Sequence, residues 1–276
     1  MPPADRKSQD GAAQATGADA RSAPRRGRAK QPGPTVVILV RHGTTTTTGH
    51  ELPGRAPGLH LSDQGRDQAE RVAGRIAAMA GVAPAPAVSG NGHDEARGGT
   101  AARAKGTRAR RGKAPSPPSV TAVYASPLDR TRETAAPIAA GLGLDVVVDD
   151  GLVELDVGEW TGLELKAARK RKEWATIQRY PSGFTFPGGE SFVAMQSRIV
   201  DALARLRRAH PGETVVAVSH ADPIRAAVAH AMGTHLDLFQ RVVVSPCSIT
   251  TIAYGDEGPA VLTVNDTSAA GAAVPS

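Results

Sequence analysis

The sequence predicts a three-layer α/β/α sandwich with a mainly parallel central sheet. Short apolar runs rich in β-branched residues alternate along the chain with helical patterns, as expected of strands joined by crossover helices. Several of these runs are apolar without interruption, which is typical of strands buried on both faces. In such sheets ligands bind beyond the carboxyl ends of the strands, so we expect the site at that edge.

The first strand and the first helix are the clearest elements near the start of the pattern. TVVILV (35–40) is an uninterrupted β-branched run, and a polar, Gly-rich loop follows it. A helix then begins, with Ser62 or Asp63 as its cap. The apolar stripe of this helix consists of Ala69, Val72, Ala73, Ile76, Ala77 and Ala80.

The second strand, the second helix and the third strand follow after a long insertion. SVTAVYA (119–125) is the second strand, and it leads directly into SPLDRTRETAAPIAAGLG. We expect a helix there with Ser126 as its cap, ended by Gly141 or Gly143. LDVVVDD (144–150) is the third strand.

The rest of the chain completes the alternation. Residues 152–186 indicate a helical and irregular crossover. TVVAVSH (214–220) is the fourth strand and ADPIRAAVAHAMG the helix after it, while SITTIAY (248–254) and AVLTVND (260–266) are two strands of a hairpin. The helix before the fourth strand has a buried stripe of Phe192, Met195, Ile199, Leu203 and Leu206.

Composition separates one folded region from three low-complexity segments. Residues 1–34 and 83–119 are mainly Ala, Gly, Pro, Arg and Lys without aromatic residues, so neither can bury enough apolar surface to offset its ordering entropy. We expect both to be disordered, together with a C-terminal tail at 268–276. The domain itself is predicted over 35–267, interrupted by the insertion, and is long enough for a sizeable core.

Charge separates along the same boundaries. The net charge is +4 in 1–34 and +5 in 83–119, which leaves −3 of the chain's +6 for the folded region. A basic tail could touch anionic surfaces, but there is no interleaved aromatic residue and no recognisable nucleic-acid module. We therefore expect no specific nucleic-acid partner and interpret both segments as solvated sequence.

Cysteine content and hydropathy indicate the cellular compartment in which the protein is expected. Cys247 is the only cysteine, so the chain cannot form an intramolecular disulfide, and its neighbours VVVSPCSITTIAY resemble a buried strand. The N-terminus has no apolar signal-peptide core, and no run approaches the length of a membrane span. These features predict a cytoplasmic protein with no membrane partner.

Reactive side chains follow the four predicted parallel strands. Arg41 and His42 end the first strand, Arg130 lies in the turn after the second, Glu154 follows the third, and His220 ends the fourth. The carboxyl ends of parallel strands meet at one edge, so we expect these five residues to share a pocket. Two arginines, two histidines and one carboxylate suit an anion that is being transferred.

Each residue type has a role in phosphoryl transfer, which needs positioned groups and neutralised charge. Arg41 and Arg130 can bind phosphoryl oxygens bidentately, and the backbone N–H of Ala221, at a helix N-terminus, can donate to the same anion. A neutral His42 can attack phosphorus and hold it covalently. Glu154 can protonate the leaving alkoxide and later deprotonate water. With one cysteine and no paired His motif, we expect no metal site and no cofactor.

The order of these motifs resembles the histidine phosphatase superfamily, also called phosphoglycerate mutase-like, across 35–267. VRHGTT matches the family's Arg-His-Gly triplet, SPLDRTRETA its second block, and LVELDVGEWTG the segment of its proton donor. FPGGES and VSHADPIR match the two later blocks. The resemblance implies that His42 becomes phosphorylated, with Glu154 and His220 as the other catalytic residues.

The resemblance also chooses between alternatives that the residues leave open. It places the phosphate-binding arginine at Arg130 rather than Arg132. From the residues alone, Asp156 and Glu159 compete with Glu154 for the role of the acid. Many family members carry Asn five residues after the triplet's glycine, and here Thr48 stands there, so we expect a weaker phosphate contact from its hydroxyl.

The function predicted is a metal-independent phosphomonoester hydrolase acting on a small phosphorylated metabolite. A phosphomutase of the phosphoglycerate mutase type is the alternative, but RYPSGFTFPGGE lacks the paired arginines and proline run by which well-known mutases bind a carboxylate. A non-catalytic phosphate-binding or scaffold protein on the same fold is a second alternative. The sequence indicates neither the substrate nor the oligomeric state.

Overall fold

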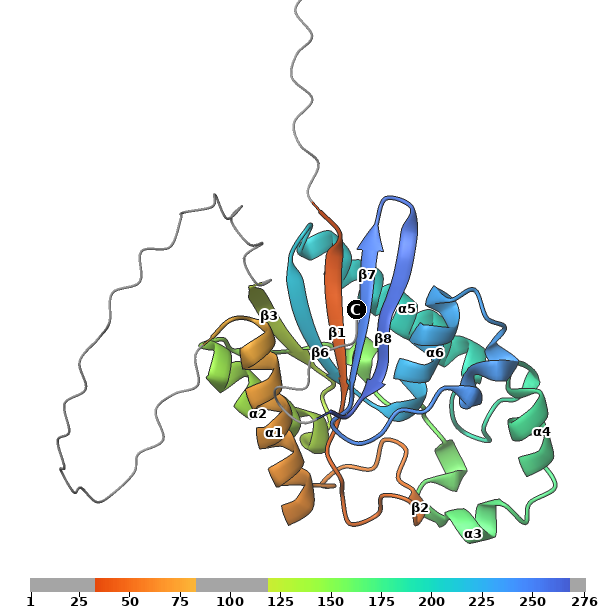
Figure 1. Cartoon of the computed structure of the whole chain (residues 1–276). Coiled ribbons are helices and arrows are strands. Elements are labelled where there is room, and N and C mark those ends of the chain that lie inside the picture. Colours follow the sequence, from red (N-terminus) through yellow and green to blue (C-terminus); the bar gives the residue numbers. More distant parts are fainter. Residues whose placement is uncertain (1–32, 83–118, 269–276) are drawn as a thin grey trace, which may run out of the picture. The chain divides into compact units, whose positions relative to one another are not determined.

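The computed structural model describes residues 33–82 and 119–268, which form a six-stranded sheet covered by helices on both faces (Figure 1). The strand order is β4-β3-β6-β1-β7-β8. The first four are mutually parallel, whereas β7 is antiparallel to β1 and pairs with β8 as a hairpin. The strands are β1 (Thr35–Arg41), β3 (Val120–Ala125), β4 (Val146–Val148), β6 (Thr214–Ser219), β7 (Ile249–Gly255) and β8 (Gly258–Asp266).

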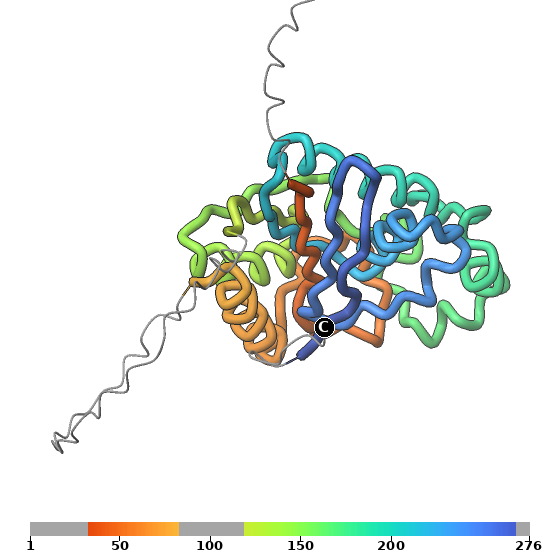
Figure 2. Tube along the Cα trace, turned by 45° about the horizontal axis from the view of Figure 1, so that its top comes forward, coloured from red at the N-terminus to blue at the C-terminus, as the bar shows by residue number. Residues whose placement is uncertain are grey.

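Two helices cover each face of the sheet, which makes the three layers visible in Figures 1 and 2. Successive residues of β1 alternate between the two cores. Ile38 and Val40 pack with the helices of one face, and Val37 and Leu39 with those of the other. The predicted α/β/α sandwich is confirmed. The helices are α1 (Asp63–Met79) and α2 (Asp129–Leu142) on the first face, and α5 (Phe192–Ala209) and α6 (Ala221–Ala231) on the second.

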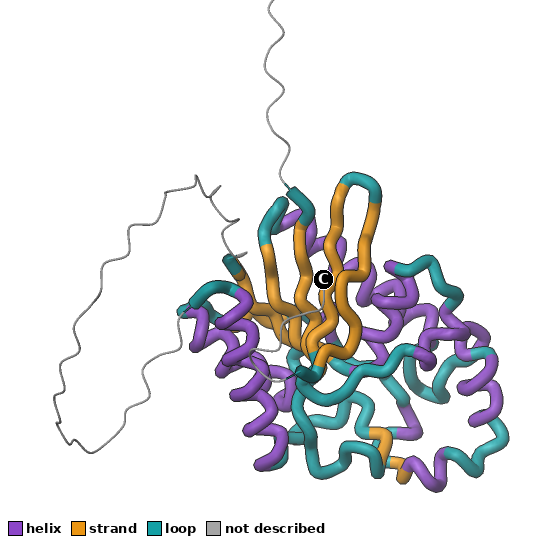
Figure 3. Tube along the Cα trace, viewed as in Figure 1, coloured by secondary structure: helices purple, strands orange, loops and turns teal. Residues whose placement is uncertain are grey.

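Irregular segments gather at the end of the sheet where β1 finishes (Figure 3). A second, two-stranded sheet pairs β2 (Glu51–Leu52) with β5 (Leu163–Glu164), and the sequence pattern does not predict it. Two residues a strand are too few to show a periodicity. The other short elements are α3 (Leu165–Ala168), α4 (Trp174–Arg179) and the 3₁₀ turns η1 (Asp150–Leu152), η2 (Gly158–Trp160), η3 (Pro181–Gly183) and η4 (Leu236–Arg241).

The helix ends confirm some local predictions and correct one. The Ser62 hydroxyl caps α1 by accepting from the Gly65 N–H, and Gly143 ends α2 in the left-handed conformation. The predicted stripe of α5 is buried throughout. The prediction that Ser126 caps α2 is wrong, because α2 begins three residues later with Leu128 at the cap position and no side-chain cap.

Two further predictions need correction. Cys247 is buried, as expected, but it does not lie in a strand: it precedes β7, and its φ of 53° is left-handed. The third strand is confined to β4, since the chain turns into η1 at Asp150. The disorder predicted for 1–34, 83–119 and 268–276 stays a prediction, because 1–32, 83–118 and 269–276 lie outside the described residues. Within the described part of the chain, no helix is long and apolar enough to cross a membrane.

Candidate active site

His42 is the residue that β1 delivers to the site. Its side chain is buried, and its Nδ1 lies 2.7 Å from the carbonyl oxygen of Gly43. A carbonyl only accepts, so Nδ1 carries the hydrogen and Nε2 keeps a free lone pair. Burial, followed by the nearby Arg130 and Arg41, lowers the pKa of His42 well below its ordinary value. The ring is therefore neutral and nucleophilic at Nε2 near pH 7.

His220 lies beside it because β6 is the parallel neighbour of β1. The backbone N–H of His42 donates to the Ser219 carbonyl at 3.0 Å, which aligns the two strand ends. The His42 and His220 rings are 5.2 Å apart between centroids, at 62° to one another. Burial, followed by Arg130 and His42, lowers the pKa of the fully buried His220, so this ring is neutral as well.

Two buried guanidinium groups complete a cationic site. Arg130 is 1% exposed and donates from Nη2 to the Gly54 carbonyl at 2.9 Å, but its Nε and Nη1 have no described partner. Arg41 donates to the Val244 carbonyl at 2.7 Å, and its Nε has no described partner either. Neither group forms an ion pair among the described residues. Buried donors without acceptors are costly, so this arrangement suits a bound anion.

Glu154 supplies the carboxyl group of the site. Its Oε1 accepts from the Leu155 N–H at 3.0 Å, and its Oε2 is 3.8 Å from His220 Nδ1. Burial, followed by the charge of Asp222, raises the pKa of Glu154 to about 7. A carboxyl group that titrates near neutrality can both donate and accept a proton during turnover.

The two competing carboxylates lie in different surroundings. Asp156 accepts from the Gly158 N–H at 2.9 Å and lies 3.8 Å from Arg55, and Glu159 is exposed. Among the described residues, Glu154 is the one of the three that contacts His220. The geometry therefore favours Glu154 as the acid. No group of three or more His, Cys, Asp or Glu side chains in 33–82 and 119–268 is arranged to hold a metal ion.

An arginine-carboxylate-arginine cluster holds the backbone of Glu154. Arg55 Nε donates to the Glu154 carbonyl at 2.8 Å, and Arg198 donates to it at 3.3 Å. Glu190 accepts from both arginines, at 2.8 and 2.9 Å. Arg198 also donates to the Val153 carbonyl at 2.8 Å. We did not predict this cluster, because its members lie far apart in the sequence and each resembles a surface charge.

Residues of the SPLDRTRETA block contact three parts of the site. Ser126 Oγ is 2.8 Å from His220 Nε2, Arg130 contributes its guanidinium, and Thr134 Oγ1 accepts from the Gly43 N–H at 3.0 Å. Only Arg130 was predicted. The four-residue spacing of Arg130 and Thr134 was a usable signal, since residues at i and i+4 share a helix face, whereas Ser126 precedes the helix.

Gly43 itself must lack a side chain. A Cβ at this position would lie 2.5 Å from the carbonyl oxygen of Gly65 in the first turn of α1. No real side chain tolerates that approach to backbone. The glycine of the Arg-His-Gly triplet therefore lets α1 pack directly against the loop that carries His42.

Thr48 and Ala221 are the other two predicted phosphate-binding residues. The Thr48 hydroxyl accepts from the Thr45 N–H and bonds the Thr45 hydroxyl, both at 2.9 Å, and contacts none of the other site residues. Ala221 opens α6, which has no side-chain cap, and its N–H donates to no described residue. That free N–H suits an anion at the helix N-terminus. Both roles stay predictions.

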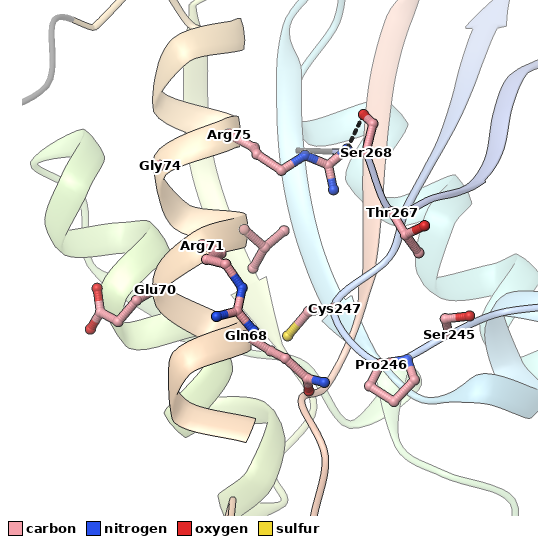
Figure 4. Close-up of a pocket in the computed structure, with 11 residues that line it drawn as sticks. Gln68, Glu70, Arg71, Gly74, Arg75, Ser245, Pro246, Cys247, Thr267 and Ser268 are labelled. Atoms are coloured by element: carbon pink, nitrogen blue, oxygen red, sulfur yellow. Dashed lines mark hydrogen bonds between the residues drawn. The ribbon is translucent and has the colours of Figure 1, made fainter. Parts of the chain in front are cut away.

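A separate cavity of about 690 Å³ lies between α1 and the segments that flank the β7–β8 hairpin (Figure 4). The residues that line it do not include Arg41, His42, Arg130, Glu154 or His220. Its wall nevertheless contacts the His42 segment: Gln68 accepts from the Thr44 N–H at 2.9 Å, and the Cys247 N–H donates to the Arg41 carbonyl at 3.0 Å. The cavity is therefore separate from the site, and two residues of its wall hydrogen-bond to the segment that carries His42.

Comparison with known proteins identifies a family for this arrangement. The profile of the histidine phosphatase superfamily (branch 1) matches residues 37–89 and 99–267. A bifunctional protein of Mycobacterium tuberculosis is 36% identical over 166 residues, which are 59% of this chain and 44% of that protein, so the match spans less than half of that relative. Phosphoserine phosphatase 1 of Hydrogenobacter thermophilus is 31% identical over 147 residues, 52% of this chain and 70% of that protein.

Solved structures share the fold at lower identity. Mycobacterial glucosyl-3-phosphoglycerate phosphatase, in complex with VO3, superposes with a TM-score of 0.64 at 20% identity, covering 84% of this chain and 99% of that one. A mutant of phosphoserine phosphatase of Entamoeba histolytica, in complex with phosphoserine, gives a TM-score of 0.65 at 20% identity over 84% of this chain and 98% of that one. At this identity the likeness shows the fold alone.

Proposed function

The chain belongs to the histidine phosphatase superfamily, and from that premise we propose that it is a phosphomonoesterase that works through a phosphohistidine on His42. One observation carries the proposal. A neutral His42 with a free Nε2 lies in a buried site that holds the unpaired donors of Arg41 and Arg130. A nucleophile and cationic donors of this kind match what phosphoryl transfer needs.

The first step forms the phosphohistidine. The Nε2 lone pair of His42 attacks phosphorus while Arg41 and Arg130 donate to the phosphoryl oxygens. The bond between phosphorus and the ester oxygen breaks, and Glu154 gives its proton to that oxygen, which leaves as an alcohol. The raised pKa of Glu154 supports this role, because a carboxyl with its ordinary pKa would hold almost no proton at pH 7.

The second step returns the enzyme to its starting state. Water attacks the phosphorus of the phosphohistidine, and its proton passes to the ionised Glu154. The nitrogen–phosphorus bond breaks, and inorganic phosphate leaves with His42 neutral again. His220 and the free N–H of Ala221 are proposed to donate to the phosphoryl oxygens in both steps.

No divalent cation is required in this scheme, because the two guanidinium groups supply the positive charge on the phosphoryl group. We therefore propose that the enzyme is metal-independent. The alcohol is proposed to be part of a small phosphorylated metabolite. Two relatives are named for phosphoserine and for glucosyl-3-phosphoglycerate, and both of these esters carry a carboxylate close to the phosphate. Carboxylate-bearing phosphomonoesters are the first substrates to test.

The experiment is a parallel assay of the full chain after exhaustive EDTA treatment. Phosphate release is measured from para-nitrophenyl phosphate and from a panel of phosphorylated hydroxy and amino acids, beside a coupled assay for conversion of 3- to 2-phosphoglycerate. We expect hydrolysis without isomerisation. Isomerisation would identify a phosphomutase, and activity that returns only with Mg²⁺ or Zn²⁺ would overturn metal independence. If the protein shows no activity in either assay but still binds inorganic phosphate, it is a non-catalytic binding protein.

A further inference from the structure

We infer that Ser126 is a positioning residue that sets the tautomer of His220, so that His220 presents Nδ1–H to the transferring phosphoryl group. The expected effect of this tautomer on turnover rests on the proposed function. Its structural basis is the 2.8 Å contact between the Ser126 hydroxyl and His220 Nε2, which joins residues 94 positions apart. Both side chains are completely buried.

The position of Ser126 is determined on several sides. Its backbone N–H donates to the Val218 carbonyl at 3.0 Å, two residues before His220, because β3 pairs with β6. Its carbonyl accepts from the Thr131 hydroxyl at 2.9 Å. The hydroxyl group therefore has little freedom to leave His220, and the contact is a built part of the site.

The direction of this hydrogen bond follows from what else contacts the hydroxyl. The Leu128 N–H points at Ser126 Oγ from 3.4 Å, and a hydroxyl oxygen can accept that hydrogen bond while its own hydrogen goes elsewhere. His220 Nε2 is the partner at hydrogen-bonding distance. Ser126 then donates, Nε2 accepts, and the ring hydrogen of the neutral His220 is on Nδ1.

The surroundings of the other ring nitrogen, Nδ1, agree with this tautomer of His220. His220 Nδ1 is buried without a described hydrogen-bond partner, and it lies 3.8 Å from Glu154 Oε2. A bare lone pair there would face carboxylate and phosphoryl oxygens, which are themselves acceptors. With hydrogen on Nδ1, the same nitrogen becomes a donor toward the phosphoryl group and toward the ionised Glu154.

The consequence is a division of roles between two identical rings. His42 has its hydrogen on Nδ1, bound to the Gly43 carbonyl, and turns Nε2 toward phosphorus as a nucleophile. His220 has the same tautomer, set by Ser126, and turns Nδ1–H toward the phosphoryl oxygens as a donor. Without Ser126, His220 could place its hydrogen on either nitrogen, and the donor would be present only part of the time.

Nitrogen-15 NMR of the full chain labelled at histidine tests the tautomer directly. In phosphate-free protein we expect His220 to show a protonated Nδ1 and an unprotonated Nε2, with its resonances assigned by their loss in His220→Gln. A protonated Nε2 would overturn the inference. This measurement needs no turnover, so its outcome is independent of whether the protein proves to be a phosphatase.

Substitution tests the consequence. Ser126→Ala should weaken binding of inorganic phosphate and lower kcat/KM, each by the reciprocal of the fraction of His220 that keeps its hydrogen on Nδ1, which is about twofold for an equal mixture and about tenfold where a tenth remains. Its His220 spectrum should show a mixture of tautomers. The control, Thr121→Val, removes a hydroxyl of β3 that bonds Glu213 and does not contact Ser126 or His220, and it should change neither value. Unchanged phosphate binding in a folded Ser126→Ala protein with a mixed tautomer would show that His220 does not donate to the anion.

Discussion

The surroundings of His42 and of His220 differ although the two rings lie side by side at adjacent strand ends. The His42 ring is oriented by the carbonyl of the next residue, Gly43, so its tautomer is a local property of the triplet. The His220 ring is oriented by Ser126 from another strand and faces Glu154 from the crossover. The tautomer of His42 thus depends on its own loop alone, whereas the surroundings of His220 depend on three segments that meet through the sheet.

This difference predicts how each histidine responds to change. Substitutions in β3, α2 or the Glu154 loop can change the orientation of the His220 ring. The tautomer of His42 should respond less to them, because its hydrogen bond is to the next residue. The support of the nucleophile comes instead from close packing, at Gly43 against Gly65 and through Thr134. Three measurements can break or sharpen this comparison.

The largest expected effect is the loss of His42. His42→Ala should lower kcat on para-nitrophenyl phosphate by at least about 10⁴-fold, because the proposed mechanism loses the nitrogen that takes the phosphoryl group. His220→Gln should cost less, about 10²- to 10³-fold, as expected when one donor to a developing charge is removed. Acid-labile protein-bound phosphate, trapped during turnover, should vanish in the first variant and persist in the second. Trapping on a His42→Ala protein would reverse the assignment of the two histidines.

The next effect concerns the proton of Glu154 and depends on pH. The carboxyl donates its proton to the leaving group, so kcat/KM for an alkyl phosphate should fall as pH rises through about 7, where Glu154 ionises. Glu154→Gln should lower that rate about 10²- to 10⁴-fold and remove this limb of the profile, while para-nitrophenyl phosphate, whose leaving group needs no proton, should lose much less.

Asp156→Asn serves as the matched control for Glu154→Gln, since Asp156 lies two residues away and contacts Arg55 rather than His220. Asp156→Asn should keep the fall of kcat/KM as the pH rises through about 7. Equal losses on alkyl and aryl esters in Glu154→Gln would show that Glu154 does not act as the acid.

The smallest effect should come from removing sequence remote from both histidines. The described elements that flank residues 83–118 are the end of α1 and the start of β3, and both lie at the end of the sheet opposite the carboxyl end of β1 (Figure 1). We predict that a chain without 1–33, and with 84–118 replaced by a short Gly/Ser linker, folds as the one domain proposed here. Its turnover should stay within about twofold of the parent, because exposed loops add few contacts.

Retention on heparin at low salt should show the change that turnover does not. Segments 1–34 and 83–119 carry +9 in total and the remaining sequence −3, so the shortened chain should elute earlier. A large fall in turnover at an unchanged melting temperature would contradict the separation of these segments from the two histidines.

Much of the fold could be predicted because it depends on local pattern. The β-branched runs of β1 and β6 are buried on both faces, the stripe of α5 recurs at helical spacing, and Gly143 ends α2 in a left-handed conformation that favours glycine. Arg41, His42, Arg130 and His220 could also be predicted to meet, since parallel strands bring their carboxyl ends to one edge.

Other features depended on which segments pack together, and periodicity does not contain that information. Local sequence indicates a helix cap at Ser126, but the pairing of β3 with β6 places its hydroxyl on His220 instead. Sequence spacing does not show which of Glu154, Asp156 and Glu159 is the acid. They differ in the structure because Arg55, Glu190 and Arg198 hold the Glu154 backbone beside His220.

The sequence by itself therefore determined the layers and the two strand ends that carry His42 and His220, and the tautomer of His42 is set within one loop. Only the tertiary structure distinguished the surroundings of Glu154 from those of Asp156 and Glu159 and determined the orientation of the second histidine. The physical reason is that burial patterns repeat along the chain at fixed spacing, whereas the buried hydrogen bonds at His220 and Glu154 join segments whose separation in sequence is arbitrary.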